Sequence, residues 1–273
     1  MAAAADDRAL SHASFWDDRY SQSDGSAPTH EWFRSFSALE SFFEANLFSS
    51  PGHAPGDRPL ILHLGSGDST IPIEFAARSY DRQLCADFSS TVVKIMKEKH
   101  AQYGIEWRLM DVRDMQCMED SSVDIAFDKG TLDAMIHGSP WSPPQEVRDN
   151  TSAYLKEVHR VLKDNGRFLY VTFRQPHFMK PLLNPEGLDW DVQLQVLGDS
   201  GSFDYYGYLI RKKLATKPEG VEVDVALINV YKDMLLFHLK TVVLFEKSQF
   251  VLHVALDALK PSMAEVVSSF NGT

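Results

Sequence analysis

Leu60-Ile-Leu-His-Leu-Gly-Ser-Gly-Asp-Ser69 joins a short apolar run to a glycine-rich turn. An apolar run that ends at a glycine is typical of a buried parallel strand. Gly65 and Gly67 let the backbone turn sharply and let a ligand approach the main chain closely. A helix that begins directly after this turn would point free N–H groups at the same ligand. The stretch therefore predicts a strand, a ligand-binding turn and a helix.

The chain on the C-terminal side of this turn alternates between strand and helix patterns. Strands alternating with helices predict a parallel sheet that is covered on both faces. After residue 173 the alternation stops, and two strands follow with only a glycine-containing turn between them. The expected strands are 60–64, 83–88, 105–110, 123–127, 167–173, 192–197 and 203–211, and the expected helices include 69–80, 90–103 and 150–162, the last ended by Asp164-Asn165-Gly166. The pattern predicts an α/β, Rossmann-like fold with a seven-stranded, mostly parallel sheet and a C-terminal antiparallel hairpin.

Aspartates stand where the expected strands end. Asp87 lies 20 residues after Gly67, where nucleoside-binding folds place a carboxylate on the ribose hydroxyls. Asp111 closes the next strand and Asp128 the one after it. Any one of these acids could be a simple loop cap. Their coincidence at successive strand ends indicates a ligand site at the carboxyl edge of the sheet.

The glycine turn distinguishes between two cofactors. A nicotinamide site usually has a third glycine in G-x-G-x-x-G, and Thr70 stands at that place here. S-adenosylmethionine has no pyrophosphate and does not need the third glycine. The hairpin also suits a methyltransferase better than a dehydrogenase with six parallel strands. We therefore expect a class I S-adenosylmethionine-dependent methyltransferase fold rather than a nicotinamide dehydrogenase.

Several segments add specificity beyond the glycine turn. They are Phe15-Trp-Asp-Asp-Arg-Tyr20, Glu31-Trp-Phe33, Ile61 to Ser69, Asp87 to Val93, Met110-Asp-Val-Arg113 and Asp128-Lys-Gly-Thr-Leu-Asp-Ala134. Together they resemble the elongation factor 1-alpha lysine methyltransferase 4 family, and they are similar to the N-terminal domain of methyltransferase-like protein 13. The resemblance runs from about residue 14 to 213. The motif Lys129 to Asp133 is its most discriminating part, and Asp128 departs from the glutamate that is usual there.

The resemblance implies a protein-lysine methyltransferase that uses S-adenosylmethionine and acts on elongation factor 1-alpha. It also implies how the cofactor is held: aromatic residues close over it, glycines lie against it, and aspartates bind its ribose and adenine. The implied cofactor-binding residues are Trp16, Tyr20, Trp32, Gly65, Gly67, Asp87, Phe88, Asp111, Val112 and Lys129.

Candidates for the substrate side are Asp128, Asp133 and His177. The two acids could attract and position a substrate ammonium, and His177 lies near the end of the fifth strand. A sulfonium is already an activated methyl donor, so orientation matters most, and we assign no catalytic base. Two alternatives stay open: a small-molecule methyltransferase of the same fold, and a cofactor-binding module without turnover.

Composition limits the partners. The chain has 27 Lys and Arg against 38 Asp and Glu, a formal charge of −11. Such acidity argues against nucleic acid as a partner, because phosphate binding needs clustered basic residues. It permits a basic protein partner. Cys85 and Cys117 show no metal-ligand or disulfide spacing, so we expect no metal site.

Location and domain organisation complete the expectations. Met1 to Leu10 lacks an apolar run of signal-peptide length, and the sequence has no uncharged apolar stretch of about 18 residues. We therefore expect a cytoplasmic protein with no membrane partner, acting as a monomer. We expect a disordered start over 1–14, a methyltransferase domain over 15–213, and an appendage of unknown role over 214–273.

Overall fold

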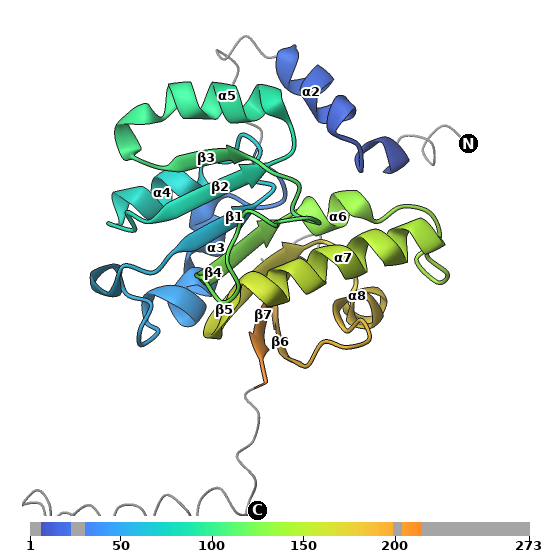
Figure 1. The fold of residues 1–273 in the computed structure, drawn as a ribbon. Helices are drawn as coiled ribbons and strands as arrows, with labels where there is room; N and C mark the ends of the chain where they lie inside the picture. Colours follow the sequence, from blue (N-terminus) through green and yellow to red (C-terminus); the bar gives the residue numbers. More distant parts are fainter. Residues whose placement is uncertain (1–6, 23–30, 199–203, 214–273) are drawn as a thin grey trace, which may run out of the picture. The chain divides into compact units, whose positions relative to one another are not determined.

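The computed structural model describes residues 7–22, 31–198 and 204–213 (Figure 1). The expected appendage over 214–273 lies outside the described residues, as do residues 1–6 of the expected disordered start. Helix α2 (Ala13–Ser21) spans the boundary expected at residue 15.

A seven-stranded sheet has the order β3-β2-β1-β4-β5-β7-β6. The first five strands run parallel, and β7 is antiparallel to both β5 and β6. The predicted fold class, including the C-terminal antiparallel hairpin, is confirmed. The strands are β1 (Ile61–Leu64), β2 (Gln83–Asp87), β3 (Glu106–Leu109), β4 (Val123–Lys129), β5 (Leu162–Thr172), β6 (Trp190–Val196) and β7 (Tyr206–Lys212).

Helices cover both faces of the sheet (Figure 1). Alternate residues of a strand point to opposite faces. Ile125 and Phe127 of β4 accordingly pack with phenylalanines from α3 and α4, whereas Ala126 packs with apolar residues of α7. The remaining described elements are α3 (Phe36–Phe43), η1 (Glu44–Phe48), η2 (Pro55–Asp57), α4 (Ile71–Ala77), α5 (Ser90–Lys99), η3 (Ala101–Tyr103), α6 (Thr131–Met135), α7 (Gln145–Val161) and α8 (Pro176–Leu183).

The carboxyl edge of the sheet lies beside a change of direction in the strand order. β1 lies between β2 and β4, so the chain leaves β1 toward one side of the sheet and later continues from β4 toward the other. Open α/β sheets bind their ligands at such a switch point, outside the carboxyl ends of the strands. The fold therefore directs attention to the loops that follow β1, β2, β3 and β4.

Several expected boundaries were wrong, among them the start of α7, which lies at Gln145 rather than residue 150, and the start of β5, which lies at Leu162 rather than residue 167. Helix α7 ends at Val161, and Asp164-Asn165-Gly166 lies inside β5 instead of ending the helix. The pairing of β4 with β5 shifts between Leu162 and Arg167, so these three residues fall in an irregularity of the ladder. The fourth strand also extends two residues further than expected, through Lys129.

Candidate active site

A cavity of about 450 Å³ opens at the carboxyl edge of the parallel strands. That volume is within the range of small-molecule sites. The structure brings to this one cavity all ten residues for which the sequence implied a role in cofactor binding. They are Trp16, Tyr20, Trp32, Gly65, Gly67, Asp87, Phe88, Asp111, Val112 and Lys129.

The glycine turn after β1 forms the floor of the cavity and requires its glycines. Gly65 and Gly67 have φ values of +61° and +52°, which side chains with a Cβ rarely adopt. A Cβ on Gly65 would overlap Thr131, and a Cβ on Gly67 would lie 2.7 Å from the hydroxyl of Tyr20. The turn therefore requires glycine at both positions, because it packs directly against Thr131 and Tyr20.

Asp87 ties this turn to the end of β2. Its carboxylate is buried and accepts hydrogen bonds from the N–H of Gly67 at 2.8 Å and of Ser89 at 2.9 Å. Burial disfavours the charged form and raises the pKa of Asp87 to about 6. Each carboxylate oxygen retains a second lone pair, so Asp87 can still accept from two hydroxyls of a ligand.

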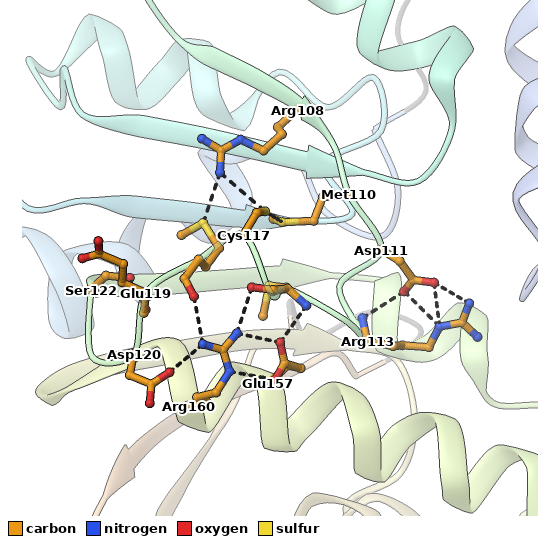
Figure 2. A network of polar contacts seen from close by, with 12 residues as sticks. Arg108, Met110, Asp111, Arg113, Cys117, Glu119, Asp120, Ser122, Glu157 and Arg160 are labelled. Carbon is orange, nitrogen blue, oxygen red and sulfur yellow. Dashed lines mark hydrogen bonds and ion pairs between the residues drawn. The ribbon is translucent and has the colours of Figure 1, made fainter.

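Asp111, after β3, is held rigidly by Arg113 (Figure 2). The guanidinium donates Nη2–H to Oδ2 at 2.7 Å and Nε–H to both oxygens, and the Arg113 N–H bonds Oδ1 at 2.9 Å. Burial would raise the pKa of Asp111, but these bonds outweigh it and hold the pKa below its usual value. Arg113 Nη1 also donates to Asn150 on α7. The adjacent Val112 is buried in the core.

A second network fixes the loop that continues from Asp111. Figure 2 shows Arg160 of α7 reaching this loop, where it pairs with Asp120 at 2.7 Å and donates to the carbonyl oxygens of Met115 and Met118. Glu157 accepts from the N–H of Met115 at 2.6 Å. The loop that carries Asp111 is therefore anchored to α7 over its length.

An aromatic wall closes the cavity from the N-terminal side. Trp16 and Tyr20 of α2 stack with their ring centroids 5.9 Å apart, and Trp32 meets Trp16 edge-on at 6.0 Å. Helix α2 is fastened to α5 by Asp17, which accepts from Ser89 Oγ at 2.6 Å. The helix that carries Trp16 and Tyr20 is thus fixed to the start of α5, and it covers one side of the site.

Lys129, the last residue of β4, forms an ion pair with Glu31. Its Nζ lies 2.6 Å from Glu31 Oε1 and donates to the carbonyl oxygen of Trp32 at 2.7 Å. The Lys129 side chain is only 4% exposed. Burial lowers the pKa of Lys129, and Glu31 opposes that shift. The sequence motif Glu31-Trp-Phe33 contained this partner, but nothing in the sequence linked it to Lys129.

Only one of the three substrate-side candidates lies at the cavity. Asp133 lines it, and its carboxylate accepts from Thr172 Oγ1 at 2.6 Å and from the Tyr170 hydroxyl at 2.8 Å. Asp128 is fully buried and instead accepts from the first N–H groups of α6, at Thr131 and Leu132, and from the Tyr154 hydroxyl. His177 is exposed on α8, where its ring lies 5.8 Å from Trp141. The structure therefore does not bring Asp128 and His177 to the cavity.

The structure adds an aromatic slot for which the sequence assigned no role. We use this name for Phe33, Phe173 and Tyr205. Phe33 lies 5.3 Å from Phe173 and 6.0 Å from Tyr205, and both phenylalanines line the cavity. Phe33 has a φ of +62°, and its ring packs over Gly130, where a Cβ would lie 3.3 Å away. Phe173 is 48% exposed, so the slot reaches the surface.

Further features of the described residues bear on the class of site. No group of three or more His, Cys, Asp or Glu side chains in the described part of the chain could hold a metal ion. No helix within the ranges 7–22, 31–198 and 204–213 is both long and apolar enough to cross a membrane. Cys85 is a buried free thiol and Cys117 an exposed one.

Comparison with known proteins identifies the class. Residues 62–170 match the family model described as a methyltransferase domain. A SAM-dependent methyltransferase from Leishmania major has the same fold, with a TM-score of 0.50 and 13% identity over 74% of this chain and 86% of that one. With the strand order and the site above, the chain is a class I S-adenosylmethionine-dependent methyltransferase.

The particular family follows from relatives at higher identity. The chain is 33% identical to EEF1A lysine methyltransferase 4 of Bos taurus, over 81% of this chain and 80% of the relative. The mouse protein of the same name is 32% identical over 72% of this chain and 74% of the relative. The human eEF1A lysine and N-terminal methyltransferase is 31% identical over 52% of this chain and 20% of its own length. The chain belongs to the EEF1A lysine methyltransferase 4 family, and the resemblance stated from the sequence is confirmed.

Proposed function

We propose that this chain methylates a lysine side chain of a protein, and that the protein is elongation factor 1-alpha. The observation that carries the proposal is the 33% identity to EEF1A lysine methyltransferase 4 over 80% of that relative. The segments that carry the resemblance include residues that line one cavity at the switch point of the sheet.

The cavity fits the cofactor on two grounds. The glycine turn after β1 lines the cavity with backbone in a positive-φ conformation that glycine adopts without strain. Asp87 has a buried carboxylate with free lone pairs toward the cavity. In the proposed arrangement Asp87 accepts from the ribose hydroxyls, Phe88 lies beside the adenine, and Asp111 accepts from the adenine amine. S-adenosylmethionine supplies an activated methyl group when it is bound.

The aromatic slot suits the lysine that accepts this methyl group. A lysine amine must be neutral to act as a nucleophile, and its unperturbed pKa is about 10.4. A slot lined by Phe33 and Phe173 would exclude water from the amine and so lower that pKa. The aromatic faces would also attract the ammonium on its way in. Proximity and alignment then provide most of the rate acceleration, without an assigned base.

Asp133 has a supporting role in this proposal. Its carboxylate is engaged by Tyr170, Thr172 and Arg174, with Arg174 Nε at 3.4 Å. Arg174 follows Phe173 directly, and its guanidinium lies 5.3 Å from that ring. Asp133 therefore fixes the segment that presents the slot.

Location and assembly are also part of the proposal. We propose a cytoplasmic enzyme, in line with the free thiols of Cys85 and Cys117. A monomer is sufficient, since one chain supplies both the cofactor cavity and the slot.

A methyl-transfer assay on a cell lysate tests the proposal. With labelled S-adenosylmethionine, the enzyme should label one dominant protein band of the size of elongation factor 1-alpha. A Lys→Arg substitution at the labelled position should abolish the signal, because a guanidinium stays protonated and is a poor nucleophile. Labelling of small molecules alone would instead support the small-molecule alternative. Cofactor binding without transfer to any acceptor would support the non-catalytic module.

A further inference from the structure

Every Lys or Arg that lines the cavity, among the described residues, is ion-paired with a carboxylate. Arg113 pairs with Asp111 at 2.7 Å, and Arg174 pairs with Asp133 at 3.4 Å. In both pairs the carboxylate also lines the cavity. The third cation, Lys129, differs because its partner Glu31 is not a lining residue. Lys129 therefore lines the cavity, whereas the carboxylate paired with it does not; Asp128 and Asp68 act on its charge as well, after Glu31.

Glu31 is held in place by contacts with two parts of the sheet edge. Its Oε2 accepts from the N–H and the Oγ1 of Thr70, both at 2.8 Å, and its Oε1 accepts from Ser69 Oγ at 2.8 Å. The same Oε1 lies 2.6 Å from Lys129 Nζ. Glu31 thus connects the segment after the glycine turn with the end of β4. Its side chain is only 16% exposed, so water screens the charge of Glu31 only weakly.

We propose that Glu31 is a positioning residue that acts through its charge, because it neutralises Lys129 and so lets the cavity accept a positively charged sulfonium. S-adenosylmethionine carries this charge, whereas its demethylated product is a neutral thioether that is otherwise identical. An unpaired Lys129 would repel the first and leave the second almost unaffected. The charge of Glu31 therefore sets how strongly the enzyme prefers cofactor over product. This inference requires only cofactor binding and is independent of the identity of the substrate.

Glu31→Gln is the first variant, because the amide keeps the shape and can still bond Ser69 and Thr70. Calorimetry gives the dissociation constants of S-adenosylmethionine and of its demethylated product at about pH 6.5 and again at about pH 5.5, because burial lowers the pKa of Lys129 and the unpaired amine is more fully protonated at the lower pH. A unit charge roughly 10 Å away at an effective dielectric constant of about 30 changes a dissociation constant about sixfold. The cofactor-to-product ratio of dissociation constants should therefore rise about sixfold. A merely structural role would weaken both ligands equally.

Further variants separate charge from shape. Lys129→Gln should move the ratio the opposite way, since it leaves Glu31 uncompensated; this result stands even if Glu31→Gln fails to fold. The double variant should return the ratio close to that of the wild type. Asp124→Asn is the matched control, because Asp124 also pairs with a lysine, Lys163 at 2.7 Å, but outside the cavity. It should leave the ratio unchanged.

Three results would overturn the proposal. They are equal weakening of both ligands in Glu31→Gln, a shifted ratio that persists in the double variant, and a shift of the same size in Asp124→Asn. Loss of binding of both ligands in all variants would exclude the electrostatic role of Glu31. That result would leave the proposed protein substrate untested and unchanged.

Discussion

Replacing Asp87 by Asn tests the assignment of the cofactor site. In the structure each carboxylate oxygen of Asp87 already accepts one backbone N–H, from Gly67 or Ser89, and has one lone pair left for a ribose hydroxyl. Asparagine keeps the shape but loses the charge and one of the two acceptors. Hydrogen bonds to a charged group contribute about 1.5–3 kcal/mol each. We expect a loss of about 2 kcal/mol, which is roughly a thirtyfold increase in the dissociation constant of S-adenosylmethionine.

The same substitution should have little effect on folding. Burial raises the pKa of Asp87 to about 6, so the ionised carboxylate is disfavoured in the folded protein. Asparagine removes that buried charge, which offsets the lost N–H acceptor, and the free energy of unfolding at about pH 8 should change by no more than about 1 kcal/mol. Calorimetry measures the binding and thermal unfolding measures the stability. Unchanged cofactor affinity in a folded variant would refute the role of Asp87.

The raised pKa also predicts a pH dependence. The ribose hydroxyls donate to the ionised carboxylate, so the affinity should be full above pH 6 and decrease as the pH falls through about 6. The decrease should be absent in Asp87→Asn, which has no proton to bind at that position. A wild-type profile that stays flat between about pH 5 and 8 would contradict this account.

Three further predictions concern other parts of the chain. Gly65→Ala should abolish cofactor binding or prevent folding, because the new Cβ would need a φ of +61° and would overlap Thr131; binding at wild-type affinity would show that the turn can relax. Phe173→Ala should raise the KM for the protein substrate at least about tenfold while the cofactor dissociation constant stays within about twofold, since the exposed Phe173 ring is proposed to contact the substrate lysine and losing such an aromatic contact costs about 1–3 kcal/mol; equal effects on both would contradict a role of Phe173 in substrate binding. Truncation after Lys213 should leave a protein that binds the cofactor, since 214–273 is proposed as an appendage; insolubility or a large fall in Tm would contradict that boundary.

The parts of the fold that depend on local pattern could be predicted from the sequence. The run that ends at Gly65 and the acids at the following strand ends are separated by short distances along the chain, and the alternation of strands and helices predicts parallel strands, whose carboxyl ends meet at one edge. The segment Asp164-Asn165-Gly166 misled because turn residues end helices and also occupy strand irregularities. These three residues lie in a strand because β5 pairs with Val123 and Ile125 of β4. That pairing joins segments far apart in the chain, so no local sequence pattern reveals it.

The candidate site likewise has a part that the sequence predicts and a part that it does not. Its backbone positions follow from the strand ends, whereas the direction of each side chain depends on tertiary contacts. Asp128 turns beneath α6 because Gly130, with a φ of +102°, reverses the chain and directs the first N–H groups of that helix to its carboxylate. Glu31 meets Lys129 only because the N-terminal segment folds back over the sheet edge. Contacts of this kind are settled by the packing of distant segments.

Incubation of the purified chain with S-adenosylmethionine and purified elongation factor 1-alpha, followed by peptide mass spectrometry, tests the central claim most directly. The account predicts that the elongation factor gains one or more methyl groups on a single lysine, and that Asp87→Asn slows this gain at limiting cofactor. An elongation factor of unchanged mass, with an enzyme shown by calorimetry to bind the cofactor, would contradict it.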